Sequence, residues 1–387
     1  MKIVVAPDSY KGSLSSEEIC RIVARAVADE FPGAEVVSVP MADGGEGTVA
    51  AIASATGGRL VPVTVTGPLG ERAEALWAIA GDGRTAILET ANTAGLTMVP
   101  ERRRDPLRAT SAGLGEALLA ALDAGMRRIV IGLGGSAVND GGMGFLGALG
   151  ATFRDAEGKA LRGCGGELKN VRSAYFAGLD PRLAECELIA ASDVRNPLTG
   201  ANGATAVFGP QKGVRPEDVP KLDAAMASYA DAVELALDVR VRNEPGSGAA
   251  GGLGFALRAI GAAVRSGAEI VAEAVGLEEK LRGADWAVTG EGRSDGQTLQ
   301  GKLPSFVSEA AHRAGVPCLL LSGSIGEPSG ELRKRFDGCF SIVNGPADLE
   351  TCLREAEPNL YRTAGEIMKV IQACARTGKS SGAGSAF

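Results

Sequence analysis

Apolar and polar positions in the first 55 residues follow two alternating periods. The runs 2–6 and 36–39 are almost continuously apolar and β-branched, which predicts two buried strands. Between them Ser15 and Glu18 form a capping-box signature, and apolar residues then recur at helical spacing: Ile19, Ile22, Val23, Ala26 and Val27. The pattern therefore predicts a βαβ unit at the start of the chain.

The pattern changes near residue 56, where we expect a second domain to begin. Three strand-like runs follow at 60–66, 71–80 and 84–90, separated by glycine-containing turns, and they predict an antiparallel meander. A helical pattern at 107–124 then leads into the apolar run 127–131, which we interpret as a buried strand.

From residue 285 the alternation of strands and helices returns. Strands are expected at 286–289, 318–321 and 340–343, and a helix at 305–314. We infer an α/β fold in which both ends of the chain form one doubly wound parallel sheet of about five strands, with a mixed α/β domain inserted. The expected domains are 1–55 with 284–378, and 56–283; residues 379–387 (KSSGAGSAF) resemble a disordered tail.

Composition narrows the classes of function. The net charge of −7 argues against a nucleic-acid or anionic-membrane surface, and no apolar run approaches the roughly 20 residues of a membrane span. Seven cysteines without a CxxC pair indicate a reducing, cytoplasmic setting. The single histidine, His312, lies in a predicted helix and is expected to be structural, so acid–base chemistry falls to carboxylates or lysines.

Residues 132–142 (GLGGSAVNDGG) carry the strongest signal for a site. They follow a predicted strand and precede a weakly helical segment, a geometry that aims backbone N–H groups at an anion. The alternative is a turn that merely requires glycine. The candidate binding residues of this loop are Gly134, Gly135, Ser136, Asn139 and Asp140.

Other loops with acids, cations and glycines follow predicted strands. Asp43 and Glu46 alternate with three glycines, which favours a Mg²⁺ site over a simple acidic helix cap. The remaining candidates in such loops are Asp8, Lys11, Asp193, Arg195, Asn196, Lys212, Glu291, Arg293, Asp295 and Lys302. Residues 246–254 (GSGAAGGLG) add a second possible anion-facing helix start.

Familiar nucleotide motifs fit poorly. Two GxGxxG matches, at 142–147 and 246–251, are expected by chance among 55 glycines, and neither opens a clean βαβ unit. Residues 296–302 match a P-loop until Leu303 replaces the required Ser or Thr. Dispersed carboxylates with single lysines and arginines are instead typical of Mg²⁺-assisted phosphoryl transfer.

Six ordered segments also carry a resemblance. They are APDSYKGSLS (6–15), PMADGGEGT (40–48), GLGGSAVNDGG (132–142), ASDVRNPLTG (191–200), VFGPQKG (207–213) and TGEGRSDGQTLQGKLP (289–304). Together they resemble the bacterial type 1 glycerate kinase family over nearly the whole chain, to about residue 378. The departures are mild (Tyr10, Val138 and Ser247 where Phe, Thr and Ala are expected), and none removes an ionisable group.

The resemblance implies ATP-dependent phosphorylation of D-glycerate with Mg²⁺, usually to 2-phosphoglycerate, in a cleft between a flavodoxin-like domain and an inserted one. On chemical grounds Asp193 is the first candidate for the base that accepts the hydroxyl proton, and Asp295 the second. We expect Asp43, Glu46 and Glu291 to hold Mg²⁺. The cations expected to neutralise the nucleotide phosphates and the glycerate carboxylate are Lys11, Lys212, Arg293 and Lys302.

Two other functions compete with this interpretation. The α/β opening and the glycine patterns also suit a nicotinamide-dependent oxidoreductase of a small hydroxy acid. A non-catalytic phosphometabolite-binding protein is the other alternative, although its ligand would be repelled by so many carboxylates. The expected partners are D-glycerate and ATP, with no nucleic acid and no membrane, and the oligomeric state is left open.

Overall fold

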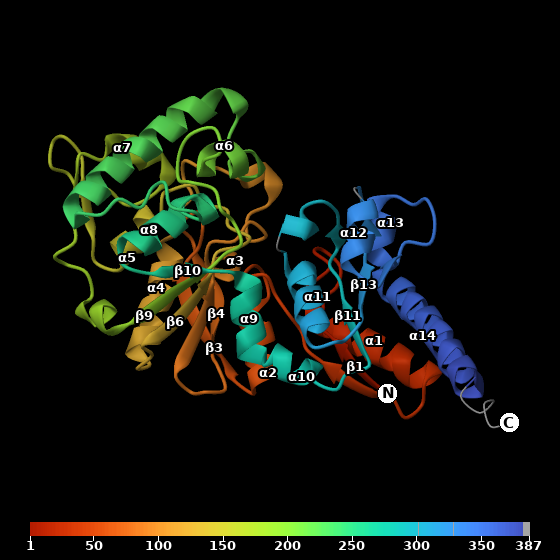
Figure 1. Ribbon diagram of the computed structural model, residues 1–387. Coiled ribbons are helices and arrows are strands. Elements are labelled where there is room, and N and C mark those ends of the chain that lie inside the picture. Colours follow the sequence, from red (N-terminus) through yellow and green to blue (C-terminus); the bar gives the residue numbers. More distant parts are fainter. Residues whose placement is uncertain (301, 328, 382–387) are drawn as a thin grey trace. The chain divides into compact units, whose positions relative to one another are not determined.

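The structure is a computed structural model that describes residues 1–300, 302–327 and 329–381 (Figure 1). The chain divides into two compact units. We call Met1–Ala42 with Ala272–Phe387 the terminal unit, and Asp43–Val271 the inserted unit. Within the described residues, no helix combines the length and the apolar character needed to cross a membrane.

The terminal unit contains a five-stranded sheet in which every neighbouring pair is parallel, as the sequence predicts. The strands stand in the order β15-β13-β11-β1-β2. Their bounds are β1 Lys2–Val5, β2 Glu35–Ser38, β11 Trp286–Thr289, β13 Cys318–Ser322 and β15 Gly338–Ser341. A parallel two-stranded ribbon, β12 (Arg293–Ser294) with β14 (Ser324–Ile325), lies beyond β11 and β13 in sequence. All loops that follow these five parallel strands therefore start at one edge of the sheet.

Helices α1 (Ser16–Glu30) and α14 (Ala356–Ser381) pack side by side in the terminal unit (Figure 1). The capping box predicted at Ser15 and Glu18 starts α1, and its apolar face joins the strand side chains in one core. The other helices are α10 Leu277–Leu281, α11 Leu303–Arg313, α12 Ser329–Arg335 and α13 Leu349–Arg354, and α9 (Gly267–Val275) spans the boundary between units. His312 Nε2 lies 2.8 Å from Asp337 Oδ2, on the surface.

The C-terminal helix is longer than expected. It continues to Ser381, so residues 379–381 are helical although the sequence pattern predicts a disordered tail. Residues 382–387 lie outside the described part of the chain.

The inserted unit contains a six-stranded mixed sheet in the order β10-β9-β6-β5-β4-β3. The bounds are β3 Arg59–Thr66, β4 Arg72–Ile79, β5 Thr85–Glu89, β6 Arg128–Gly132, β9 Glu187–Ala191 and β10 Ala263–Arg265. The expected meander is confirmed, because β3, β4 and β5 pair antiparallel in succession. The four neighbouring strands β5, β6, β9 and β10 pair parallel in succession, so their carboxyl ends lie at one edge of this sheet.

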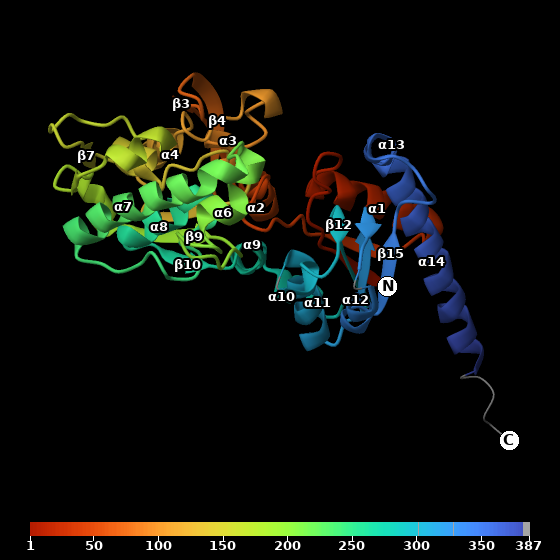
Figure 2. The ribbon, with the colours of Figure 1, turned by 90° about the horizontal axis from the view of Figure 1, so that it is seen from above.

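Helices of different lengths accompany this second sheet. They are α2 Thr48–Thr56, α3 Thr90–Thr93, α4 Ala112–Asp123, α5 Met143–Ala148, α6 Ala204–Phe208, α7 Val219–Leu237 and α8 Leu253–Ala259, with a small hairpin of β7 (Thr152–Arg154) and β8 (Ser173–Tyr175). Figure 2 shows α6, α7 and α8 next to one another. Tyr229 of α7 packs against Phe153 and Phe255, with ring centroids 5.6 and 6.0 Å away.

The unit boundaries differ from the expected ones because of α2. The sequence pattern places this helix, and the chain to residue 55, in the first domain. In the structure α2 packs on β3, β4 and β5, and the buried carboxylate of Glu89 accepts a hydrogen bond from Val49 N at 3.0 Å. The boundaries therefore fall after Ala42 and Val271, not after residues 55 and 283.

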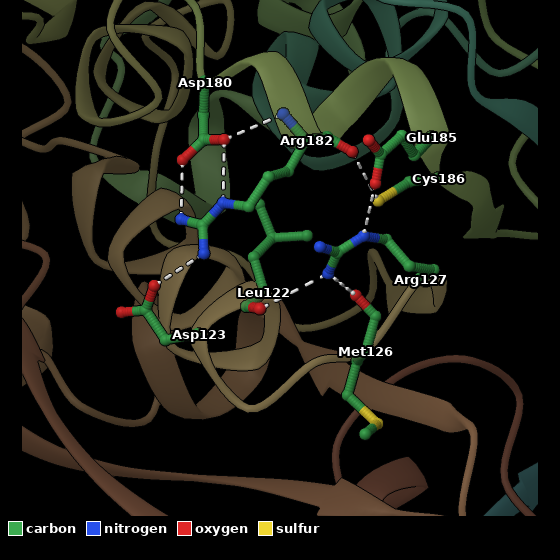
Figure 3. A network of polar contacts seen from close by, with 8 residues as sticks. All are labelled: Leu122, Asp123, Met126, Arg127, Asp180, Arg182, Glu185 and Cys186. Atoms are coloured by element: carbon green, nitrogen blue, oxygen red, sulfur yellow. Dashed lines mark hydrogen bonds and ion pairs between the residues drawn. The ribbon is translucent and has the colours of Figure 1, made fainter.

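A polar network fastens the amino ends of β6 and β9 (Figure 3). The Arg182 guanidinium donates two hydrogen bonds to the carboxylate of Asp180, at 2.7 and 2.9 Å, and one to Asp123 Oδ1 at 2.8 Å. Arg127 reaches Glu185 Oε2 at 3.1 Å. The Arg182 guanidinium lowers the pKa of Asp180 to about 2. These ion pairs join the end of α4 to the turn before β9, at the edge of the sheet opposite the glycine-rich loops.

Candidate functional site

In the terminal unit, three loops that follow β1, β11 and β13 are tied together by backbone hydrogen bonds. Asp8 N donates to Gly290 O at 2.9 Å, and Gly323 N donates to Glu291 O at 3.0 Å. Glycine is required where these loops meet, because a Cβ at Gly290 would lie 1.7 Å from Leu321 O. The segments that carry the candidate residues Asp8 and Glu291 therefore lie next to each other in this unit.

Charged side chains from these loops line one cavity of about 420 Å³. Five of the predicted site residues contribute to its wall: Asp8, Lys11, Glu291, Arg293 and Lys302. Asp295 is not part of that lining, and its carboxylate lies 3.4 Å from Arg293 Nε. The cavity opens at the carboxyl edge of the parallel strands, where α/β sheets bind ligands.

The carboxylate of Glu291 is buried and fixed by its neighbours. Its Oε1 accepts hydrogen bonds from Thr298 Oγ1 at 2.6 Å and from Ser294 Oγ at 3.2 Å. Its Oε2 lies 3.6 Å from the Nζ of Lys302. Two hydroxyls and an ammonium group thus already satisfy this carboxylate, and Lys302 is held at the rim of the cavity.

In the inserted unit, a second set of loops meets at the carboxyl edge of β6, β9 and β10. Gly134 N donates to Gly44 O and Leu133 N to Ala191 O, both at 3.1 Å. A Cβ at Gly134 would lie 2.4 Å from the Cα of Gly45, and one at Gly267 would lie 2.1 Å from Asp43 O. The glycines around Asp43 therefore let its loop pass directly over the strand ends.

This packing brings the carboxylates of Asp43 and Asp193 close enough to interact. Asp193 Oδ1 accepts a hydrogen bond from Gly267 N at 3.2 Å, at the start of α9, and Ser266 and Ala268 N also donate to it. Desolvation, with a smaller contribution from the charge of Asp43, raises the pKa of Asp193 to about 6 against the lowering effect of these donors. Asp193 is therefore a carboxylate of raised basicity that still reaches the surface.

Lys212 lies beside the glycine-rich loop 132–142. It is 2% exposed, and its Nζ donates to Ser136 Oγ at 2.9 Å and to Val138 O at 2.7 Å. Burial lowers the pKa of Lys212 to about 7, while the charge of Asp140 acts in the opposite direction. An anion brought to this lysine would favour its charged form, so binding and protonation are coupled here.

Two predicted binding residues face the protein interior. Asp140 is fully buried, and its carboxylate accepts hydrogen bonds from Ser111 N and Oγ, Gly142 N and Gly144 N. These bonds give Asp140 a structural role at the start of α5, and direct ligand contact would require the loop to open. Asn139 Nδ2 donates to Thr205 Oγ1 at 3.1 Å, whereas its buried Oδ1 has no partner within the described residues.

Other predicted positions are exposed, or are hydrogen-bonded within their own loop or to neighbouring loops. Glu46 and Arg195 are exposed, and Asn196 Nδ2 donates to Asn202 O at 2.8 Å within its own loop. The segment 246–254 does not present an open helix start. A Cβ at Gly251 would lie 2.0 Å from Val138 O, and Gly141 N donates to Gly251 O. The glycines of this segment serve close packing.

The expected metal ligands do not form one cluster. Across residues 1–300, 302–327 and 329–381, no three or more His, Cys, Asp or Glu side chains gather in a way that could hold a metal ion. Asp43 and Glu46 belong to the inserted unit and Glu291 to the terminal unit. The neighbouring carboxylates of Asp43 and Asp193 still fit Mg²⁺, which proteins commonly bind through one or two carboxylates together with substrate phosphates.

Sequence reasoning missed several residues of these two sites. Ser266 and Gly267, which donate to Asp193, follow a three-residue strand that is too short to stand out. Glu89, whose pKa is raised to about 6 by burial, lies within the predicted strand 84–90, at the end of β5, and has no glycine beside it. Leu349 and Leu353 line the cavity of the terminal unit, although they resemble ordinary positions of a surface helix.

Comparison with known proteins supports a phosphotransferase. The sequence profile described as "Glycerate kinase family" matches residues 3–372. The chain is 45% identical to the glycerate 2-kinase of Escherichia coli K12 over 373 residues, covering 96% of this chain and 98% of that one. It is 46% identical to the glycerate kinase of Bacillus subtilis 168 over 374 residues, with 96% and 98% covered.

A solved structure agrees with these matches. The crystal structure of a Salmonella typhimurium LT2 protein assigned as glycerate kinase 2 superimposes with a TM-score of 0.85 and 46% sequence identity, covering 97% of this chain and 99% of that one. The mixed α/β fold and the enzyme class thus define a kinase that acts on an alcohol group. The chain belongs to the glycerate kinase family.

Proposed function

We propose that this protein transfers the γ-phosphoryl group of ATP to the 2-hydroxyl of D-glycerate, with Mg²⁺, and releases ADP and 2-phosphoglycerate. Membership of the glycerate kinase family supports the reaction class, and one similar protein is named a glycerate 2-kinase. The observation that carries the proposal is the position of Asp193, whose carboxylate lies beside Asp43 at the carboxyl edge of the inserted sheet and accepts a hydrogen bond from Gly267 N at 3.2 Å.

Asp193 is the proposed base. As the glycerate oxygen forms its bond to phosphorus and the bond to the ADP oxygen breaks, the carboxylate of Asp193 accepts the hydroxyl proton. Phosphoryl transfer requires mainly orientation and late proton acceptance, for which an ionised carboxylate is sufficient. The donors at Ser266, Gly267 and Ala268 hold its orientation. Asp295 remains the second candidate.

The cations have complementary proposed roles. Lys11, Arg293 and Lys302 line the cavity of the terminal unit and neutralise phosphate charge. Lys212 takes up a proton when an anion approaches Ser136, because its pKa in the free protein is only about 7. Arg195 is exposed and is the proposed partner of the glycerate carboxylate.

Mg²⁺ is the proposed cofactor. Asp43 is the best placed ligand, because its carboxylate lies close enough to Asp193 to interact with it. When bound, Mg²⁺ supplies charge neutralisation of the phosphate oxygens. Glu291 is less suited, since hydroxyls and Lys302 already surround its carboxylate.

The strand order of the terminal unit indicates a particular α/β fold. The parallel sheet of the terminal unit has its strands, numbered along that unit, in the order 2-1-3-4-5, which is the flavodoxin-like order. We therefore infer a flavodoxin-like unit interrupted by the inserted unit. A cytoplasmic location also stays a prediction, and it agrees with the finding that no disulfide joins the cysteines within the described residues.

Release of ADP tests the reaction. ATP and Mg²⁺ should yield ADP with D-glycerate, much less with L-glycerate, and none above background without an acceptor. Chelation of Mg²⁺ with EDTA should abolish the release, and added Mg²⁺ should restore it. Oxidation of NADH without ADP release would instead support the oxidoreductase alternative.

A further inference from the structure

The lining of the cavity in the terminal unit contains two chemically different sets of residues. Charged residues of the loops after β1 and β11 form one set, among them Lys11, Arg293 and Lys302. The other set, which we call the apolar wall, follows β15 or belongs to α13 and the start of α14: Ile342, Val343, Leu349, Leu353 and Ala356. A ligand that fills this cavity therefore needs an apolar body and an anionic group.

Part of the apolar wall is exposed. Leu349 is 73% exposed and Leu353 is 36% exposed, so one large apolar side chain that borders the hollow is mostly uncovered and a second is partly covered. Exposed leucines are ordinary when they are scattered, but here they line the same concave surface as three cations. Covering them with a planar apolar group would gain burial free energy.

The acids in this lining do not oppose an anion. Glu291 is satisfied by two hydroxyls and lies 3.6 Å from the Nζ of Lys302. Asp8 is 5% exposed, and its Oδ1 accepts from Ser9 N at 2.7 Å. The three cations of the lining (Lys11, Arg293 and Lys302) outnumber its two carboxylates (Asp8 and Glu291), so the lining carries a net positive charge.

We propose that this cavity is the nucleotide site, with the adenosine of ATP against Leu349, Leu353 and Val343, and its phosphates directed to Lys11, Arg293 and Lys302. This assignment rests on the proposed function, which requires ATP. A volume of about 420 Å³ lies within the range of small-molecule sites, and it exceeds what a three-carbon hydroxy acid needs. Glycerate also has no apolar group that would match the leucines.

The position in the sheet agrees with this assignment. The order β15-β13-β11-β1-β2 places the topological switch point between β1 and β11, and the loops that follow these two strands supply Lys11 and Arg293. Ligands of open α/β sheets bind in the crevice at such points.

Titration of two ligands tests the proposal. The double variant Leu349→Ala/Leu353→Ala removes the apolar wall and retains helix-forming residues in α13. We expect the Kd for ATP to rise about tenfold, whereas the Kd for inorganic tripolyphosphate, which has no nucleoside, should change less than twofold. Calorimetry measures both with the full chain. Leu235→Ala is the matched control, because Leu235 is an 80% exposed helical leucine of the inserted unit.

Two outcomes would overturn the assignment. An unchanged Kd for ATP would place the nucleoside elsewhere, and an equal loss of affinity for both ligands would show that the wall acts through the fold. The single variant Leu349→Ala changes the more exposed of the two leucines and is therefore the less disruptive to folding. It should still raise the Kd for ATP without raising the Kd for tripolyphosphate. The wild-type assay with glycerate separates the two proposals, since the double variant can lose ATP affinity whether or not glycerate is the acceptor.

Discussion

The Nζ of Lys212 donates a hydrogen bond to Oγ of Ser136 at 2.9 Å, across 76 residues of sequence. The bond joins the turn after α6 to the glycine loop after β6. Because the lysine is buried, its pKa is lowered to about 7, and its charge in the free protein depends on pH in the physiological range.

The buried lysine makes stability depend on pH in a defined window. Between about pH 7 and pH 10.5 the unfolded chain binds the Lys212 proton and the folded chain does not, so this group makes the free energy of unfolding rise with pH. This group can change the free energy of unfolding by at most about 1.4 kcal/mol per pH unit. Urea denaturation of wild type and Lys212→Met from pH 6.5 to 9 measures it, and the difference between the two proteins should shift in favour of wild type as pH rises.

The same variant tests the role of Lys212 toward anions. We expect Lys212→Met to fold and to lose turnover by about 10²-fold or more, because Ser136 and the neighbouring amides then act without a cation. Lys221→Met, at an exposed lysine of α7, is the control and should retain turnover. A pH-independent difference in stability together with normal turnover would contradict the assignment.

Substitution of the proposed base should separate turnover from binding. Asp193→Asn is expected to lower kcat by about 10²- to 10⁴-fold, while calorimetry still detects ATP binding. Asp295→Asn is the matched control, because it changes the second candidate in the other unit. If Asp295→Asn caused the larger loss, the two roles would be exchanged.

The pH profile provides an independent test of Asp193. Its carboxyl must be ionised to accept a proton, and its pKa is about 6. The wild-type kcat/KM should therefore fall about tenfold per pH unit below pH 6 and lose this dependence above it. A profile that stays flat down to pH 5 would exclude Asp193 as the base.

Asp140 should act on stability. Replacing this fully buried carboxylate by alanine leaves the donors of Ser111, Gly142 and Gly144 unsatisfied. We expect Asp140→Ala to lower the free energy of unfolding by about 3 kcal/mol or more, as measured by urea denaturation. A variant of unchanged stability that no longer binds ATP would instead assign Asp140 to the ligand.

The network in Figure 3 should stabilise the fold at neutral pH. The pKa of Asp180 is lowered to about 2, so its contribution is complete above the unfolded-state pKa and is lost as the pH falls through about 2. Arg182→Ala should therefore lower Tm at pH 7, and the difference from wild type should shrink as the pH falls below about 4. Turnover per folded molecule should not change, because this edge of the sheet is opposite the candidate site.

Strands and loop positions followed from the sequence because they depend on local chemistry. The strands of the terminal unit are short continuous apolar runs, and the capping box at Ser15 marks the start of α1. Parallel strands place their following loops at one edge, so the convergence of acidic and glycine-rich segments within each unit could be expected.

Other features of the structure depend on tertiary contacts and could not be predicted from the sequence. The unit that α2 joins depends on the buried Glu89 and on strands far along the chain, which no local pattern encodes. The same limit explains the segment 246–254, whose glycines look suited to an anion but pack against Val138 and Gly141. Leu349 and Leu353 were missed because only the folded chain shows that they border a hollow.

Phosphorus NMR of the product tests the central claim most directly. Wild-type protein incubated with ATP, Mg²⁺ and D-glycerate should produce ADP together with one new phosphomonoester signal that coincides with added 2-phosphoglycerate. A signal that coincides with 3-phosphoglycerate would contradict the proposed position of transfer. The absence of any phosphomonoester, with ATP intact, would contradict glycerate as the acceptor.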